Sequence, residues 1–254
     1  MTKTPAAARA ALDALQRDRD ALVAICAGLT EEQWAAPSGC EGWTVKDLVS
    51  HVGALFWLVV DQSKLPDASG LATEKAQDVY VDSRRSWTAA QVVEDYESVS
   101  TRAIDALRGL ASQDFELPLG DLGTYPASLL PCCYAFDHFT HMRADLFAPR
   151  GPLQTEPPTA DGMRVQAALD WVAAALPQQN AGLIQQLRGA VDLEVDSPIV
   201  ANIRVGTGEP AGRITSDGLG FVRWVTGRES WEELGVRASG PDDVLGLGRR
   251  FHVF

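Results

Sequence analysis

The first 150 residues repeat apolar side chains at the three- and four-residue spacing that is typical of amphipathic helices. The spacing predicts four long helices, with apolar positions over Ala11–Ile25, Leu48–Val59, Val92–Leu107 and Leu129–Phe147. Thr44 followed by Asp47 predicts a capped start for the second helix. About 25 mainly polar residues connect the second and third helices, and we expect them to form a short helix or to lie over a site. Four such helices predict a bundle.

A proline-rich segment at residues 148–162 forbids a continuous helix and divides the chain. We expect a helical domain at residues 1–150, a linker at 151–162 and a second domain at 163–254. A helical pattern follows in TADGMRVQAALDWVAAAL, strand patterns in AVDLEVD, PIVANIRVG, AGRITSD and GFVRWVTG, and a last short helix in PDDVLGLGRRF. The predicted fold class is therefore a four-helix bundle followed by a small α+β domain.

Composition narrows the class of protein and of partner. Hydrophobic residues make up 46% of the chain and charged residues 22%, as in globular proteins. The formal net charge of −12 makes nucleic acid and anionic membranes poor partners. The longest apolar run, Ala54–Val60, is too short to cross a bilayer, and the first residues lack a signal-peptide pattern. We expect a cytoplasmic protein that acts on small molecules, as a monomer or weak homodimer.

The four cysteines give no metal-binding signature. Cys26, Cys40, Cys132 and Cys133 follow no CxxC spacing. Cys132 and Cys133 are adjacent, so their side chains point in different directions on a helix. We expect all four to be inert, reduced thiols.

Titratable residues gather in the fourth predicted helix, in FDHFTHMRADLF. His141 is central, because Asp137 and Asp145 lie one turn away on either side and His138 lies three residues before it. The second helix adds His51 on its mainly apolar side. Two histidines and an acid from facing helices form a typical catalytic metal site with one open position. A structural histidine or a solvated helix face paired with Arg143 is the alternative, and His252 is expected to be incidental.

Two motifs resemble a known family. LTEEQWAAPSGCEGWTVKDLVSHVG and, far downstream, DHFTHMRADLFAPRGPL are similar to the N-terminal domain of the mycothiol-dependent maleylpyruvate isomerase family, within the DinB-like four-helix metal proteins. The C-terminal GRITSDGLGFVRWVTGRESWEELGVRASGPDDVLGLGRRFHVF is similar to its sterol-carrier-like domain. The resemblance covers nearly the whole chain.

The resemblance implies a divalent metal, most often zinc, held by His51, Asp137 and His141. Asp137 stands where the isomerase has glutamate, and its shorter reach could move the metal or let His138 substitute as a ligand. A catalytic arginine is implied in the second domain. Arg228 in TGR is the candidate, with Arg223 and Arg213 as alternatives, and Asp145 or Arg143 would orient the ligands.

The resemblance also implies a thiol cosubstrate, mycothiol, which is characteristic of actinobacteria. A metal-activated thiolate would attack a small electrophilic substrate and bring about isomerisation or S-transfer. Arg228 would bind a carboxylate of that substrate. A thiol-independent metal-assisted hydrolase or lyase and a non-enzymatic small-molecule binding protein are the alternatives.

Overall fold

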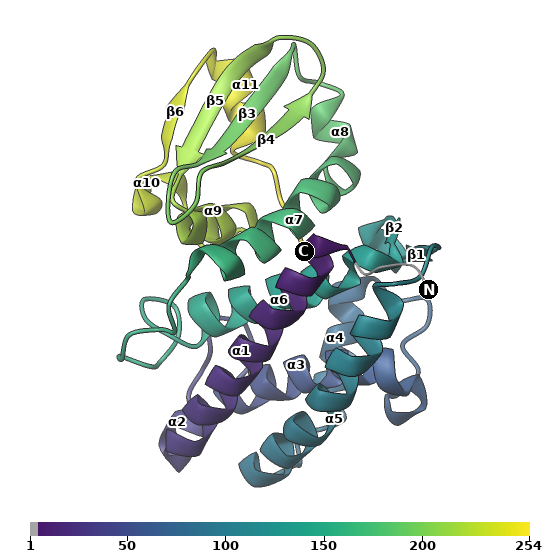
Figure 1. Ribbon diagram of the computed structural model, residues 1–254. Helices are drawn as coiled ribbons and strands as arrows, with labels where there is room; N and C mark the ends of the chain where they lie inside the picture. The colour runs from purple at the N-terminus through teal and green to yellow at the C-terminus, as the bar shows by residue number, and fades with distance from the viewer. Residues whose placement is uncertain (1–4) are drawn as a thin grey trace. The chain divides into compact units, whose positions relative to one another are not determined.

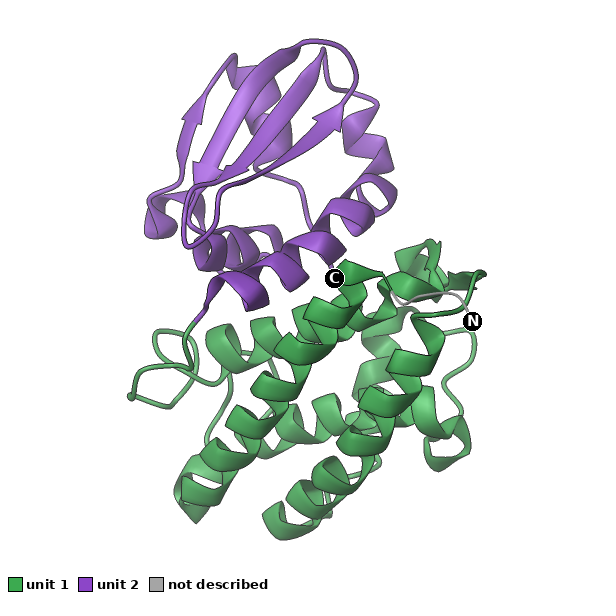
Figure 2. Cartoon of the chain, in the orientation of Figure 1, with its two compact units in different colours: residues 1–159 green, residues 160–254 purple. Residues whose placement is uncertain are grey.

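The computed structural model describes residues 5–254 and divides into two compact units, residues 1–159 and 160–254 (Figure 2). The boundary falls inside the predicted linker. Residues 1–4, which we assigned to the first domain, lie outside the described residues. Within residues 5–254, no helix is long and apolar enough to cross a membrane.

The first unit is built on four long helices, as the apolar spacing predicts (Figure 1). These are α1 (Ala6–Gly28), α3 (Val45–Val60), α5 (Ala89–Leu110) and α6 (Leu130–Thr140). Contacts join α3 to α5, α1 to α6, and α5 to both α1 and α6, which closes a four-helix bundle. Apolar side chains such as Leu15, Phe56 and Phe139 fill its core with no exposed surface. Each such burial stabilises the fold by about 1.5–3 kcal/mol.

Shorter elements join the long helices of the first unit. The connection between α3 and α5 contains a helix, α4, in agreement with one of the two expectations for it. The remaining elements are α2 (Glu31–Ala35), η1 (Gln62–Lys64), α4 (Thr73–Asp82), β1 (Glu116–Pro118), η2 (Gly120–Leu122), β2 (Thr124–Pro126), η3 (Ala127–Leu129) and the π-helical turn η4 (His141–Asp145).

The second unit is a mixed four-stranded sheet with helices, so the predicted fold class is confirmed for both units. Strand order is β4-β3-β5-β6, in which only the β3–β5 pair is parallel. Helices α9 and α11 contact β5. The elements are α7 (Gly162–Gln179), α8 (Ala181–Ile184), β3 (Ala190–Val195), β4 (Ala201–Gly206), β5 (Pro210–Ser216), α9 (Gly218–Val225), α10 (Trp231–Leu234), β6 (Arg237–Ser239) and α11 (Asp242–Gly248).

One predicted strand was wrong, because GFVRWVTG forms the helix α9. The side chain of Asp217 accepts a hydrogen bond from the backbone N–H of Gly220, which caps the helix start. Phe221, Val222, Trp224 and Val225 are all buried, which is the spacing of a helical face. The β-forming composition concealed this period. The final short helix and the strands in AVDLEVD, PIVANIRVG and AGRITSD agree with the prediction.

Candidate metal centre

Helix α3 carries His51 into the interior of the first unit. Its start is fixed by a capping box, in which the Thr44 hydroxyl accepts from the Asp47 N–H and the Asp47 carboxylate accepts from the Thr44 N–H. His51 lies about two turns further and is only 3% exposed. The Trp43 ring packs against it, with ring centroids 4.9 Å apart. The cap therefore sets the depth at which this imidazole enters the bundle.

The C-terminal end of α6 and the turn that directly follows it supply the other two predicted ligands. Asp137 lies in the last turn of α6, and His141 begins the π-helical turn η4. The N–H of Leu146 donates to the His141 carbonyl at 3.3 Å, a bond that spans five residues instead of four. Single π-helical turns inside helices frequently occur at functional sites.

The three predicted ligands converge. Nε2 of His51 lies 3.6 Å from Oδ1 of Asp137, and Nε2 of His141 lies 3.5 Å from the same oxygen. Both separations exceed ordinary hydrogen-bond lengths. They match the roughly 3.4 Å that separates two ligands of a tetrahedral ion with bonds of about 2.1 Å.

The donor set fits a divalent ion. Two imidazole nitrogens and a carboxylate oxygen are suitable ligands for zinc, and three protein ligands leave a fourth position open. The second carboxylate oxygen of Asp137 is buried and makes no hydrogen bond to any described residue. A buried oxygen in this state is costly unless a ligand satisfies it. The residues therefore fit the metal that the sequence motifs imply.

The pKa values of the ligands reflect their mutual charge. Burial opposes ionisation of Asp137, but His141 and His51 outweigh it and lower the pKa of this carboxyl to about 2. Burial likewise opposes protonation of His141, but Cys40, Asp137 and Asp145 together raise its pKa to about 10. In the metal-free protein a proton therefore occupies the position that a cation would take.

Asp145 fixes the orientation of His141. Its Oδ2 lies 2.8 Å from Nδ1 of His141, so the imidazole donates there and directs Nε2 toward Asp137. Asp145 is fully buried, and its other oxygen lies 3.5 Å from Nε of Arg150. The Gly39 N–H donates to the Asp145 carbonyl at 2.8 Å. A Cβ at Gly39 would lie 2.8 Å from both Cα and Oδ1 of Asp145, so only glycine allows this approach.

Cys40 also contacts His141, with Sγ 3.6 Å from Nδ1. All four cysteines are free, as expected, but Cys40 is not remote from the site. Cys40, Gly39 and Arg150 were not predicted to lie at the site, because a helix period cannot show which loop folds over a helix end. For Gly39 and Cys40, the available signal was their position beside the conspicuous GWT turn.

His138 and Arg143 lie outside the cluster. The ring nitrogens of His138 are 3.2 Å from the Tyr134 carbonyl and 3.1 Å from the Tyr96 hydroxyl, and burial lowers its pKa to about 4. This hydrogen bonding disfavours His138 as a substitute ligand. Arg143 is fully buried and donates to both oxygens of Asp18 at 2.8 and 2.9 Å, which ties the π-helical turn η4 to α1.

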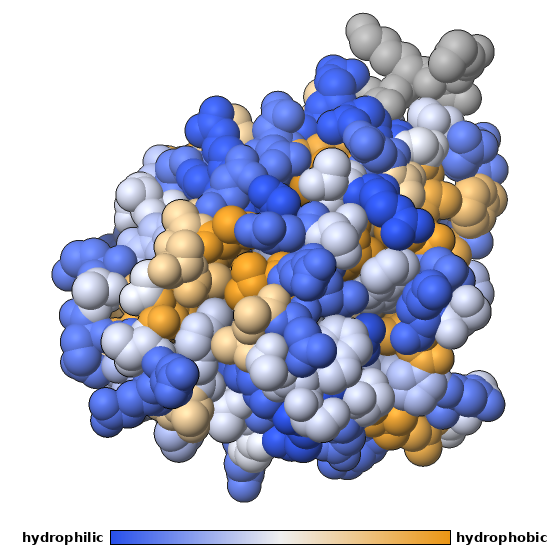
Figure 3. Space-filling view, turned by 90° about the horizontal axis from the view of Figure 1, so that it is seen from below, coloured by the Kyte–Doolittle hydropathy of each residue, from blue (hydrophilic) through white to orange (hydrophobic). Residues whose placement is uncertain are grey.

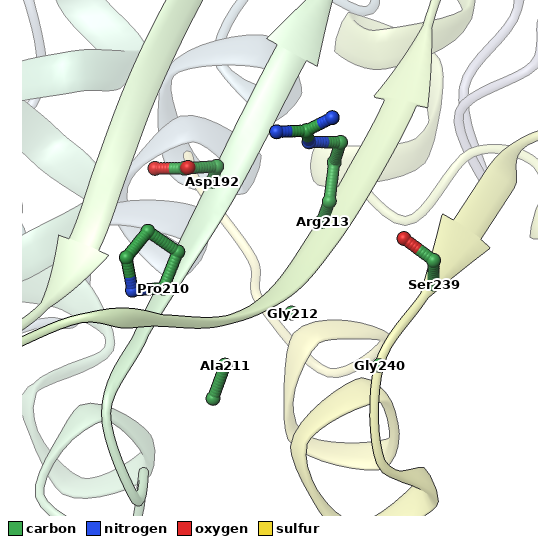
Figure 4. Close-up of a pocket in the computed structure, with 7 residues that line it drawn as sticks. All are labelled: Asp192, Pro210, Ala211, Gly212, Arg213, Ser239 and Gly240. Atoms are coloured by element: carbon green, nitrogen blue, oxygen red, sulfur yellow. The ribbon is translucent and has the colours of Figure 1, made fainter.

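The three candidate arginines all belong to the second unit. Arg228 is half-buried in the turn after α9, and its N–H donates to the Arg223 carbonyl at 2.8 Å. Arg223 pairs with Glu229 at 3.3 Å, and Arg213 pairs with Glu194 at 3.0 Å. Arg213 also lines a shallow surface pocket with Asp192 and Ser239 (Figure 4).

On the face that Figure 3 shows, hydrophilic side chains predominate and apolar ones are scattered between them. Among the described residues, two groups of side chains lie close enough together to hold a metal ion, and His51, Asp137 and His141 form one of them.

Comparison with known proteins identifies the fold and the family of this chain. Two solved structures of mycothiol-dependent maleylpyruvate isomerase, one of them a histidine-to-alanine mutant, match 91% of this chain and 92% of their own. Sequence identities are 17% and 18%, with TM-scores of 0.60 and 0.59, which shows a shared fold. No curated protein matches the sequence. Residues 15–147 match the model of the mycothiol maleylpyruvate isomerase N-terminal domain, and the chain therefore belongs to that family.

Proposed function

We propose that this protein is a divalent-metal-dependent enzyme that uses mycothiol either to isomerise a small electrophilic and carboxylated substrate or to form an S-conjugate with it (S-transfer). One observation carries the proposal: His51, Asp137 and His141 converge at metal-ligand separations in a chain of this family. Its partners would be the thiol and the small-molecule substrate.

The three converging residues would hold the ion, and zinc is the best match to their nitrogen and oxygen donors. A bound divalent ion would stabilise the deprotonated form of a thiol at neutral pH. Asp137 stays ionised throughout the neutral range because its pKa is about 2. Asp145 keeps a proton on Nδ1 of His141 and so presents Nε2 in the form that binds a cation.

Arg228 is our candidate for binding the substrate carboxylate. A guanidinium group can bind a carboxylate through two parallel hydrogen bonds, which fixes orientation as well as charge. Arg223, which pairs with Glu229, and Arg213, which pairs with Glu194, are the alternative candidates.

Calorimetric titration of the zinc-loaded protein with mycothiol tests the thiol requirement. We expect wild type to bind mycothiol, and to lose most of this affinity for an analogue in which hydroxyl replaces the thiol. The His51→Ala variant should bind neither mycothiol nor the hydroxyl analogue. Equal affinity for thiol and hydroxyl forms would contradict the proposal.

Turnover separates the enzyme classes. Maleylpyruvate, the substrate in the name of the similar structures, is the first probe, with other electrophilic carboxylates after it. Arg228→Ala should lower kcat/KM about tenfold or more, because a hydrogen-bonded charge pair contributes about 1.5–3 kcal/mol. Turnover that is the same without mycothiol would instead support metal-assisted hydrolysis.

A further inference from the structure

We propose that Cys40, His141 and Asp145 form a second metal-binding position, one that contains a thiolate and takes a soft divalent cation such as Cd²⁺. A sulfur, a nitrogen and an oxygen from these residues lie within 4.8 Å of one another. The position uses Nδ1 of His141, whereas the position formed with His51 and Asp137 uses Nε2. The two positions therefore share one imidazole.

The distances suit such an ion. Sγ of Cys40 lies 3.6 Å from Nδ1 of His141. The corresponding separation across a tetrahedral zinc ion is about 3.5 Å for bonds of about 2.3 Å to sulfur and 2.0 Å to nitrogen. The third donor, Oδ2 of Asp145, lies 2.8 Å from Nδ1 through a hydrogen bond that the cation would replace. Arg150 approaches the other carboxylate oxygen, Oδ1.

The loop holds Cys40 in place. The Cys40 N–H donates to the Ser38 hydroxyl at 3.2 Å, and that hydroxyl donates to the Trp43 carbonyl at 2.9 Å. The loop is fastened to the π-helical turn by the bond from the Gly39 N–H to the Asp145 carbonyl. Because these bonds precede any ligand, little conformational entropy remains to be lost when a cation binds.

The shared imidazole makes the two positions alternatives. A neutral imidazole coordinates through one nitrogen and keeps a proton on the other. Each chain should therefore bind one ion at a time near neutral pH. Thiolate prefers soft ions, while a carboxylate with two imidazoles accepts harder ions such as Mn²⁺. The identity of the metal would thus select the position.

Metal titration of the reduced, full-length protein without added thiol tests this inference. Cys40→Ser should weaken Cd²⁺ binding about tenfold or more and leave Mn²⁺ binding within about twofold. Cys133→Ser, which removes the other half-buried cysteine, should change neither. Equal Cd²⁺ affinities for wild type and Cys40→Ser would overturn the inference.

Cobalt gives a spectroscopic readout of the same position. His51→Ala should still bind Co²⁺ and show a sulfur-to-cobalt charge-transfer band, and adding Cys40→Ser should abolish the band. Binding without the band, or a band that survives the second substitution, would overturn the inference. His51→Gln serves if the alanine variant does not fold. Loss of Mn²⁺ binding in His51→Ala tests the first position separately, so failure of the proposed function and failure of this inference give different results.

Discussion

Asp145 does not belong to the ligand set of His51, Asp137 and His141. We nevertheless expect its negative charge to strengthen the binding of a cation by these three residues. Asp145→Asn keeps the size of the side chain but removes the negative charge beside Nδ1 of His141. Loss of such a partner lowers metal affinity about 10–100-fold. Competition with a chelating dye measures the affinity for Mn²⁺, an ion that we do not expect to bind at the Cys40 position. Asp105→Asn, at an exposed ion pair on α5, is the matched control and should have no effect; unchanged affinity in Asp145→Asn would contradict the assignment.

Gly39 is expected to tolerate no side chain. A methyl group there would lie 2.8 Å from the Asp145 backbone, which cannot move away without shifting the π-helical turn. We expect Gly39→Ala to lower the free energy of unfolding by about 1–3 kcal/mol and to weaken metal binding. Gly109→Ala is the control, since nothing lies within 4 Å of its added Cβ. If urea unfolding gives the same free energy of unfolding for Gly39→Ala and Gly109→Ala, the predicted clash is refuted.

His138 should make the metal-free protein sensitive to acid. Burial lowers its folded pKa to about 4, below the ordinary value of about 6.5 in the unfolded chain. As the pH falls below 6.5, the unfolded state takes up a proton that the folded state does not. The free energy of unfolding should therefore decrease by about 3 kcal/mol between pH 6.5 and pH 4.

Urea unfolding of wild type and His138→Gln over this pH range checks the effect. The variant cannot titrate at this position, so its stability should depend less steeply on pH. The same slope in both proteins would show that other groups cause the acid sensitivity.

The cap of α3 links helix stability to the site. Thr44→Ala should cost about 1 kcal/mol of stability, because the alanine cannot accept the Asp47 N–H. It should also weaken metal binding, since the first turn of α3 sets the position of His51. Thr88 forms the same capping box at the start of α5. Thr88→Ala should destabilise the protein equally without changing metal affinity, and a matching loss in both variants would argue against positional control by α3.

Elements whose apolar residues follow one regular spacing could be predicted from the sequence. Elements whose structure depends on packing against neighbouring segments could not. The four bundle helices follow from apolar spacing alone. Helix α9 was misread because Phe221, Val222, Trp224 and Val225 have high β propensity, while the burial of a helical face decided the structure. The end of the fourth predicted helix, 141–145, is π-helical, which the sequence pattern does not distinguish from an α-helix.

The same division applies to the site. His51, Asp137 and His141 could be chosen from helix faces and from a family resemblance, and the structure brings their side chains together. Cys40 could not be predicted in this way, because it lies 101 residues from His141 in the sequence and in a loop without periodicity. Its contact depends on a local hydrogen bond from Cys40 to Ser38 and on the tertiary hydrogen bond from Gly39 to Asp145.

At the scale of the whole molecule, a helical unit carries the candidate metal centre and a mixed-sheet unit carries the candidate arginines. Family membership supports this combination, since the similar structures share the fold over 91% of the chain. The chemistry nevertheless depends on one property of the molecule, which is its ability to hold a divalent ion at His51, Asp137 and His141.

Metal content measured by inductively coupled plasma mass spectrometry tests that property most directly. Purified full-length protein would be compared with the His51→Ala, His141→Ala double variant, which lacks ligands for both proposed positions. We predict about one zinc or similar divalent ion per chain in wild type and almost none in the variant. Wild type that is metal-free and takes up no zinc, nickel or manganese on titration would contradict the account.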